Sequence, residues 1–214
     1  TMKSKLPSEH SSAAHAIQAG LREDREGFKF RSGRLSLDFV ATVAARRKPV
    51  PRELLETPQD LDRWLKTAGV PVHTRKSGLT DLVAARELRE ALYRLAQACL
   101  QQQLFAPDDR KLVNRWAATR QPPQQLGLRP GFAVPAKDGV DLMEALATIA
   151  RDGVELFSGP QSRRIRNCER DGCSLLFVDS SRSRRRRWCS MSACGNKEKV
   201  AAHRRRHSLP AAGA

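Results

Sequence analysis

Apolar residues recur at three- and four-residue steps through much of the chain, which is the period of amphipathic helices. The longest such stretch covers residues 80–103, with apolar positions Leu82, Ala85, Leu88, Leu92, Leu95, Ala96 and Cys99. Shorter helices are predicted over residues 37–46, 58–68 and 138–157, and another begins at Pro107. The pattern therefore predicts a mainly helical chain.

One helix start is written clearly in the sequence, at Thr57-Pro58-Gln59-Asp60. Threonine caps helices, proline suits the first helical position, and a carboxylate suits the first turn. We therefore expect a helix to begin at Pro58.

Strand-like alternation is confined to short segments. Phe28 and Phe30 alternate with polar residues, as do Leu35 and Leu37, and Ser32-Gly33 lies between the pairs, so we predict a β-hairpin here. A second hairpin is predicted around residues 126–135, where Arg-Pro-Gly separates two short apolar runs. The expected fold class is α+β and mainly α: a helical domain with one or two small hairpins, followed by a small second module.

Composition divides the chain into four parts. Residues 1–26 are polar and alanine-rich and are predicted to form a flexible arm, helical near residues 13–23. Residues 27–158 form the mainly helical domain. Gly159-Pro160 and a sharp rise in arginine mark the boundary to a module at residues 162–207, which a tail at residues 208–214 follows.

Four cysteines give that module its chemistry: Cys168, Cys173, Cys189 and Cys194. They read C-x4-C, fifteen residues, C-x4-C, a spacing that brings four thiolates to one tetrahedral zinc ion. Four sulfur ligands fill the tetrahedron, so we expect one structural Zn²⁺ and no catalytic metal. The alternative is a set of free or purely structural thiols.

The backbone around these cysteines predicts a treble-clef-like arrangement. Gly172 lies in the first C-x4-C loop, where glycine allows the positive φ that turns both sulfurs to one point. Residues 174–179 are predicted to be a strand, and Cys194 is expected in the first turn of a helix over residues 195–207. The fifth cysteine, Cys99, is interpreted as a core residue of the long helix.

The charge distribution suggests a polyanionic partner. The formal net charge is +16, and residues 161–207 hold fourteen Lys and Arg against four Asp and Glu. We predict that the module contacts duplex DNA, with RNA or ribosomal RNA and protein-only contact as alternatives. The candidate contact residues are Arg184, Arg185, Arg186, Arg187, Asn196, Lys197, Lys199, His203, Arg204, Arg205 and Arg206.

The chain resembles the CGNR zinc-finger proteins that carry an N-terminal ABATE domain. The resemblance runs through residues 164–168 (RIRNC), 173–181 (CSLLFVDSS), 185–190 (RRRWCS) and 194–197 (CGNK), and covers about residues 27–207. The ABATE part is matched by the segments at 33–40 (GRLSLDFV), 57–64 (TPQDLDRW) and 86–90 (RELRE).

The resemblance implies a bacterial, zinc-dependent transcription regulator. The chain departs from the family pattern at two positions. Lys197 stands where the family's name has arginine, and Ala41 stands where asparagine is usual.

Enzymatic, membrane and secreted classes are disfavoured. The sequence has no G-x-S-x-G, P-loop, G-x-G-x-x-G or H-E-x-x-H motif. No stretch approaches the ~18 consecutive apolar residues of a membrane span, and the N-terminal segment lacks the apolar region of a signal peptide. Thiols that bind zinc fit a reducing cytosol, so we expect a cytoplasmic, nucleoid-associated protein.

Arg34 and Asp38 are the remaining candidate site residues. We favour a structural ion pair or cap for them, and the alternative is that they line a ligand pocket in the helical domain. The predicted function is a zinc-dependent DNA-binding transcription regulator whose helical domain senses an effector, forms a homodimer, or contacts the transcription machinery. The alternative is a zinc-bearing adaptor that binds RNA polymerase, the ribosome or RNA.

Overall fold

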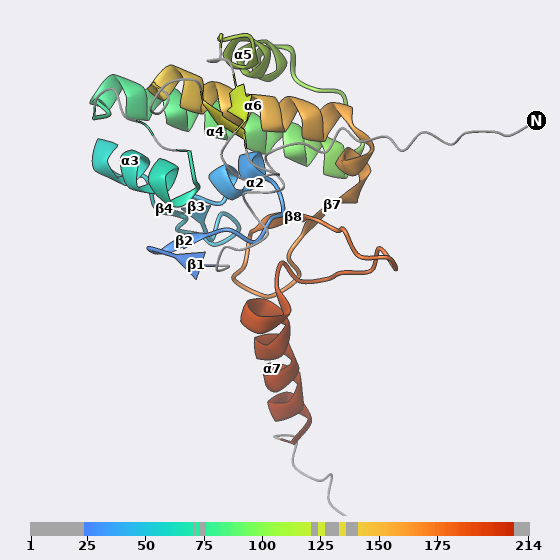
Figure 1. Ribbon diagram of the computed structural model, residues 1–214. Coiled ribbons are helices and arrows are strands. Elements are labelled where there is room, and N and C mark those ends of the chain that lie inside the picture. Colours follow the sequence, from blue (N-terminus) through green and yellow to red (C-terminus); the bar gives the residue numbers. More distant parts are fainter. Residues whose placement is uncertain are drawn as a thin grey trace, which may run out of the picture.

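The computed structural model describes residues 24–70, 72, 76–120, 124–126, 133–135 and 141–207. Helices dominate these ranges and strands occur as short antiparallel pairs, which confirms the α+β, mainly α class (Figure 1). Among the described residues, no helix has the length and apolar character needed to cross a bilayer. The helix predicted near residues 13–23 and the tail at 208–214 lie outside the described ranges.

Helices fill the middle and the end of the chain. The α-helices are α2 (Leu35–Val40), α3 (Pro58–Thr67), α4 (Leu79–Gln101), α5 (Pro107–Ala117), α6 (Leu142–Ser158) and α7 (Asn196–His207). A 3₁₀-helix, η1 (Pro160–Arg164), follows α6, and a π-helical turn, η2 (Met191–Gly195), leads into α7.

Each sheet has two antiparallel strands. The pairs are β1 (Asp24–Arg25) with β2 (Phe28–Lys29), β3 (Val43–Ala44) with β4 (Arg52–Glu53), β5 (Gln124–Leu126) with β6 (Ala133–Pro135), and β7 (Ile165–Asn167) with β8 (Leu176–Val178). The second predicted hairpin is therefore confirmed, and the strand expected at 174–179 is β8. β1 lies within the segment that was assigned to the N-terminal arm.

The predicted hairpin over residues 28–37 is wrong in its turn and its second strand. The turn lies earlier, at Glu26 and Gly27, whose φ angles of 48° and 83° are left-handed. Leu35 and Leu37 belong to α2 instead. All six residues of α2 are buried, so this helix has no polar face and its apolar pattern carries no helical period.

The helix predicted over residues 37–46 is also too long. α2 ends at Val40, where the Thr42 hydroxyl donates to the carbonyl of Phe39. Val43 and Ala44 then pair with β4 instead of continuing the helix. The predicted starts of the helices at Pro58 and Pro107 are confirmed. Thr57 and Asp60 form a reciprocal capping box on α3, and α5 begins at Pro107.

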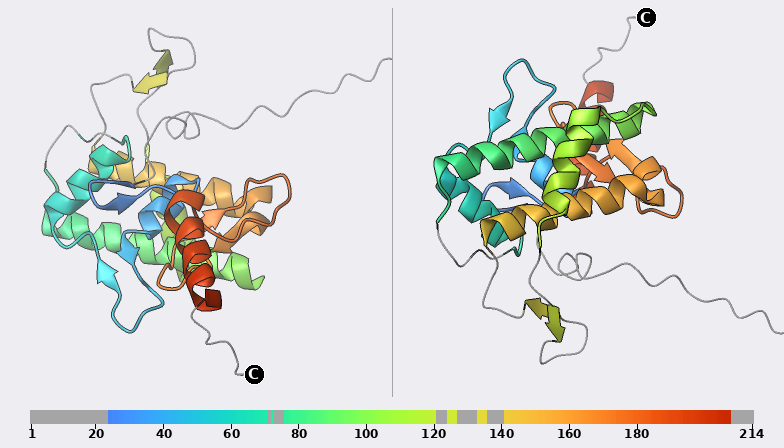
Figure 2. Two further views of the ribbon diagram at one scale, coloured as in Figure 1. Left: turned by 90° about the horizontal axis from the view of Figure 1, so that it is seen from below. Right: turned by 90° about the horizontal axis from the view of Figure 1, so that it is seen from above.

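The helical body, residues 24–158, has α4 and α6 side by side over α2, with α5 packed against both from the far side (Figures 1 and 2). Gly153 permits the close approach of α6 to α4, because a Cβ atom there would lie 2.5 Å from Cδ2 of Leu92. Trp64 of α3 is fully buried and its ring centroid lies 4.8 Å from that of Phe39. These contacts bury α2 at the centre of the body.

A buried ion pair fixes the start of α2 on α6. Arg34 Nε donates to Asp152 Oδ1 at 3.0 Å, and the other Asp152 oxygen accepts from the backbone N–H and hydroxyl of Ser36. Arg34 and Asp152 are both almost completely buried. Breaking one partner of such a pair costs about 3–5 kcal/mol, so this junction holds α2 firmly.

Asp38 faces a different environment on the same helix. Its Oδ1 accepts from the backbone N–H of Ser32 at 3.0 Å, and its side chain is fully buried. Burial raises the pKa of Asp38 to about 7, and the nearby Asp152 carboxylate adds to the shift. The carboxyl group therefore holds a proton in the folded state over a pH range where it is ionised in the unfolded chain.

The raised pKa of Asp38 makes the folding stability decrease as the pH rises. A carboxyl with a raised folded-state pKa contributes stability that is complete below its unfolded pKa, near 4, and is lost as the pH rises through 7. We expect Asp38→Asn to remove this loss of stability with rising pH, which amounts to as much as ~1.4 kcal/mol per pH unit across the window. The variant should gain stability relative to the wild type between pH 5 and 8 in urea unfolding. Parallel pH profiles for the two proteins would contradict the assignment.

Candidate metal centre and nucleic-acid interface

The four cysteine sulfurs converge on one point. The Sγ atoms of Cys168, Cys173, Cys189 and Cys194 all lie within 4.8 Å of one another, and all four residues are buried. Cys189 Sγ lies 4.0 Å from Cys173 Sγ and 3.6 Å from Cys194 Sγ. Four sulfurs at the zinc–thiolate distance form a tetrahedron with edges of about 3.8 Å, so the donor set fits zinc.

The first pair of cysteines is presented by a turn that closes on itself. Gly172 has φ 72°, the left-handed value expected from the sequence. The N–H of Cys173 donates to the Arg170 carbonyl at 3.0 Å, and the N–H of Cys168 donates to the Leu175 carbonyl at 2.9 Å. The β7–β8 hairpin flanks this turn and carries it.

The second pair of cysteines lies at the base of α7. The N–H of Cys194 donates to the Ser190 carbonyl at 3.1 Å, and α7 begins two residues later. Gly195 fits here because a Cβ atom would lie 2.6 Å from the sulfur of Met191 and 3.2 Å from the Trp188 ring. The Cys-Gly-Asn segment therefore packs tightly enough to require its glycine.

The thiols also need a cation to ionise together. Hydrogen bonds to the sulfurs of Cys168 and Cys173 raise the pKa of Cys189, and burial and repulsion from those two sulfurs raise it further. Arg170 lies beside the cluster. Burial works to lower the pKa of this arginine, but attraction to Cys194, Cys173 and Cys168 raises it overall. A divalent metal would satisfy the same demand at the centre.

The apolar cluster around the cysteines includes a residue from the helical body. Leu175 and Phe177 are buried against the sulfurs, and Ala41 from the end of α2 joins them. Ala41 is the position where the resembling family usually has asparagine. In this chain it packs into an apolar cluster, so no polar site forms there.

The loop after β3 makes polar contacts with the first cysteine turn. The Arg46 N–H donates to Ser174 Oγ at 2.7 Å. The guanidinium of Arg47 donates to the carbonyl of Cys168 at 2.7 Å and also to that of Cys173. A cavity of about 300 Å³ lies where this loop meets the first cysteine turn. The helical body therefore supports the backbone of two of the four candidate ligands.

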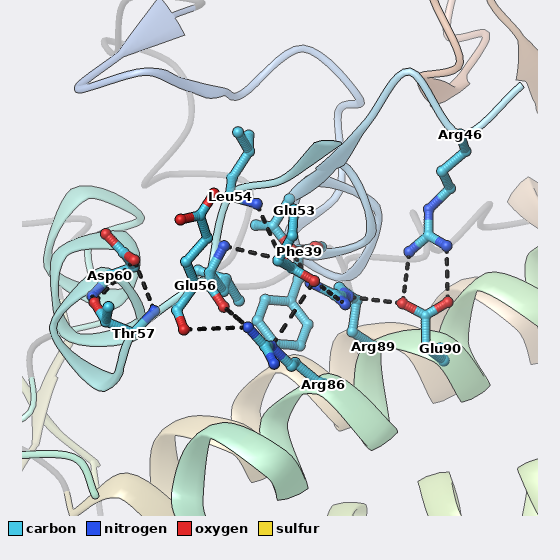
Figure 3. Close-up of polar contacts among 12 residues, drawn as sticks. Phe39, Arg46, Glu53, Leu54, Glu56, Thr57, Asp60, Arg86, Arg89 and Glu90 are labelled. Atoms are coloured by element: carbon cyan, nitrogen blue, oxygen red, sulfur yellow. Dashed lines mark hydrogen bonds and ion pairs between the residues drawn. The ribbon is translucent and has the colours of Figure 1, made fainter. Parts of the chain in front are cut away.

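Helix α4 holds this loop in place (Figure 3). Arg46 makes two hydrogen bonds to Glu90, at 2.7 and 2.9 Å, and Arg89 makes two to Glu53, at 2.6 and 2.7 Å. Burial works to raise the pKa of both carboxyl groups, but the paired arginines outweigh it and lower both pKa values. Arg86 adds hydrogen bonds to the Leu55 carbonyl. The Arg-Glu-Leu-Arg-Glu segment of α4 thus binds the chain just after β3 and within β4, on either side of the turn between them.

The arginine loop, residues 180–187, is folded around one buried carboxylate. Asp179 accepts from the N–H and hydroxyl of Ser181 and from the N–H of Arg186, so it ties the two ends of the loop together. Arg184, at the bend, has φ 52°. Arg184 and Arg185 are exposed as a result.

Arg182 is exposed as well, and Arg186 and Arg187 contact other parts of the module. Arg186 Nε donates to the Trp188 carbonyl at 2.9 Å, and its guanidinium also contacts the Cys189 carbonyl and lies 4.8 Å from the Phe177 ring centroid. Arg187 pairs with Glu169 at the surface. The predicted contact set is therefore not uniform: Arg186 stabilises the third cysteine, and the exposed charge comes from its neighbours.

Helix α7 projects away from the helical body (Figure 1). Asn196, Lys197, Lys199 and His203 are exposed on it, as are Arg204 and Arg205. Arg205 pairs with Glu198 at 3.0 Å. The side chain of Arg206 lies outside the described part of the structure.

Arg34 and Asp38, the candidate pocket residues, lie in the buried network at the start of α2. Their contacts, with Asp152 and with the backbone of Ser32, are those of an ion pair and a cap. Neither residue lines the cavity between the loop after β3 and the first cysteine turn. Their role in a ligand pocket stays a prediction.

Sequence reasoning missed the part that Arg46 and Arg47 play at the metal centre. The predicted helix over residues 37–46 ends at the start of the Arg-Arg-Lys run, and the sequence predicts no role for these cations at the metal centre. A cluster of cations in a loop does not by itself reveal that the Arg47 guanidinium donates to carbonyl oxygens more than a hundred residues away.

A helical body joined to a four-cysteine finger defines the class as a zinc-finger protein. Residues 33–160 match the ABATE family, described as a "putative stress-induced transcription regulator", and residues 164–207 match the CGNR zinc finger. The chain therefore belongs to the ABATE family and carries a CGNR zinc finger. Comparison with curated proteins gives no match.

The contacts of Arg47 predict an effect on metal affinity. Arg47→Ala removes the donor to both ligand-bearing carbonyls, and losses of outer contacts at metal sites cost about 10–100-fold in affinity. We expect zinc affinity to fall by about tenfold, measured by competition with a chromophoric chelator. Lys48→Ala is the matched control, because the Lys48–Asp171 pair is exposed. Equal zinc affinity for Arg47→Ala and the wild type would refute the supporting role.

Proposed function

We propose that this protein is a zinc-dependent transcription regulator that binds duplex DNA through α7 and the arginine loop. The observation that carries the proposal is the placement of α7. A basic helix leaves the metal centre and extends from the body, with Lys197, Lys199, Arg204 and Arg205 exposed (Figure 1). The family description points in the same direction.

The zinc ion in this proposal is structural. One Zn²⁺ held by Cys168, Cys173, Cys189 and Cys194 would use all four tetrahedral positions and leave none for substrate. Because α7 begins two residues after Cys194, the metal would fix the base and direction of the helix. Zinc binding then orders the DNA-contacting surface without touching DNA itself.

Helix α7 suits the major groove in size and chemistry. Its twelve residues span about 18 Å, and the groove of B-DNA admits a helix. Asn196 offers an amide that can read an adenine edge, and Val200, half exposed one turn later, offers an apolar contact to a thymine methyl group. Lys197, Lys199 and the following arginines supply phosphate contacts.

The arginine loop supplies contacts to the flanking backbone. Arg184 and Arg185 are exposed at its bend, Arg182 is exposed before them, and Arg187 adds a cation that is paired with Glu169. Arg186 acts indirectly, by holding the carbonyls next to Cys189. The proposed phosphate grip therefore rests on Arg184 and Arg185.

The helical body would connect DNA binding to a signal by sensing an effector, by forming a homodimer, or by contacting the transcription machinery. A cytoplasmic, nucleoid-associated location follows from the proposal. The competing function, an adaptor on RNA polymerase or ribosomal RNA, would use the same cations.

Replacement of Arg184 and Arg185 tests the proposed phosphate contacts of the arginine loop. Each phosphate contact contributes about 0.9 to the slope of log K against log salt, so Arg184→Ala/Arg185→Ala should lower that slope by about two. The measurement is fluorescence anisotropy of the zinc-loaded chain with labelled duplex DNA. Lys111→Ala/Arg115→Ala, on exposed positions of α5, is the charge-matched control and should bind as the wild type does.

Selection of bound fragments from a genomic DNA pool at ~150 mM salt then separates the two functions. A recurrent sequence motif supports a specific regulator. Failure of the zinc-loaded wild type to retain any DNA, together with co-purification of RNA polymerase or ribosomes, would overturn the proposal in favour of the adaptor.

A further inference from the structure

The segment joining β3 to β4 is strongly basic. Residues 46–52 read Arg-Arg-Lys-Pro-Val-Pro-Arg, with four cations and no acidic residue. Two of the cations are already engaged: Arg46 with Glu90, and Arg47 with the carbonyls of the first cysteine turn. The remaining two, Lys48 and Arg52, lie in residues 48–52, the turn together with the first residue of β4, which we define as the hairpin tip.

The base of this hairpin is rigid. β3 and β4 pair in antiparallel register, and the two arginine–carboxylate pairs from α4 hold both strands. Bidentate pairs of this kind fix geometry as well as charge. The hairpin is therefore a preformed projection, and little conformational entropy would be lost when a partner binds it.

The hairpin tip is exposed and stiff. All five of its residues are exposed, and the Val50 side chain retains 82% of its accessible surface. Pro49 and Pro51 restrict the backbone on either side of Val50. Lys48 faces Asp171 at 3.4 Å, but both side chains are largely exposed, and such a pair contributes little. A phosphate group can therefore compete for Lys48.

The hairpin tip and α7 both lie next to the metal centre. Lys48 lies opposite Asp171 in the first cysteine turn, whereas α7 begins beside the fourth cysteine. Seen from below, the β3–β4 hairpin and the arginine loop lie on opposite sides of α7 (Figure 2, left). A helix in the major groove, which is about 12 Å wide, has a sugar–phosphate backbone on each side.

We infer that the hairpin tip is a second DNA contact, supplied by the helical body. Lys48 and Arg52 bind the phosphates of one strand while the arginine loop binds those of the other, with α7 between them. This inference rests on the proposed DNA-binding function. It makes the helical body part of the DNA-binding surface, so the finger alone would hold DNA less tightly than the whole chain.

The test removes the two tip cations. In the zinc-loaded full chain, Lys48→Ala/Arg52→Ala should lower the slope of log K against log salt by about two, at one unit per phosphate contact. Lys111→Ala/Arg115→Ala removes the same charge from α5, at the opposite end of the molecule from α7, and should leave the slope unchanged (Figure 1). Zinc content and the urea midpoint of each variant verify that it is folded.

A photo-crosslinking residue in place of Val50 provides a second measurement. It should couple to duplex DNA, whereas the same residue in place of Leu104, which is 97% exposed in the α4–α5 connection, should not. A wild-type salt slope for the tip variant together with no crosslink at position 50 would overturn this inference while DNA binding by the wild type still supports the proposed function. Absence of DNA binding by the wild type would overturn both.

Discussion

The guanidinium of Arg47 lies against the carbonyl oxygens of Cys168 and Cys173, and the rest of the arrangement depends on this contact. In the finger, Arg47 holds the backbone of the first two cysteines in position. In the helical body, Arg47 is itself fixed because the neighbouring Arg46 is paired with Glu90 of α4. The metal centre therefore belongs to both parts of the chain. Ala41 of the helical body is buried among the cysteines and adds an apolar contact between the two parts.

This shared centre explains how a small zinc finger can present a long exposed helix. A module of under ~50 residues has too little core to be stable alone and draws on its metal for folding energy. Here it draws on the helical body as well: Ile165, Leu176 and Val178 of the β7–β8 hairpin pack into the main apolar core. With its base secured in this way, α7 needs no packing along its length, and Lys197 and Lys199 are exposed to solvent.

Local features of the fold could be predicted from the sequence, and long-range ones could not. The cysteine spacing, the glycine in the first turn and the capped start of α3 are set by neighbouring residues, so the sequence reveals them. α2 is buried on every side, so its residues lack the period that identifies a helix. Four consecutive arginines look alike in the sequence, and only Asp179, which binds the backbone of Ser181 and Arg186, separates the exposed ones from the structural one. The Arg47 contacts join residues 121 and 126 positions apart, which no local pattern encodes.

We expect zinc binding at the four cysteines to stabilise the helical body as well as the finger. Urea unfolding of the full chain with Trp188→Phe tests this, because the remaining tryptophans, Trp64 and Trp116, are buried in the helical body and report its unfolding. A ligand that binds only the folded state raises its stability by RT ln(1 + [L]/Kd). Removal of zinc with a chelator should therefore lower the unfolding midpoint reported by these two tryptophans. Identical midpoints with and without zinc would contradict it.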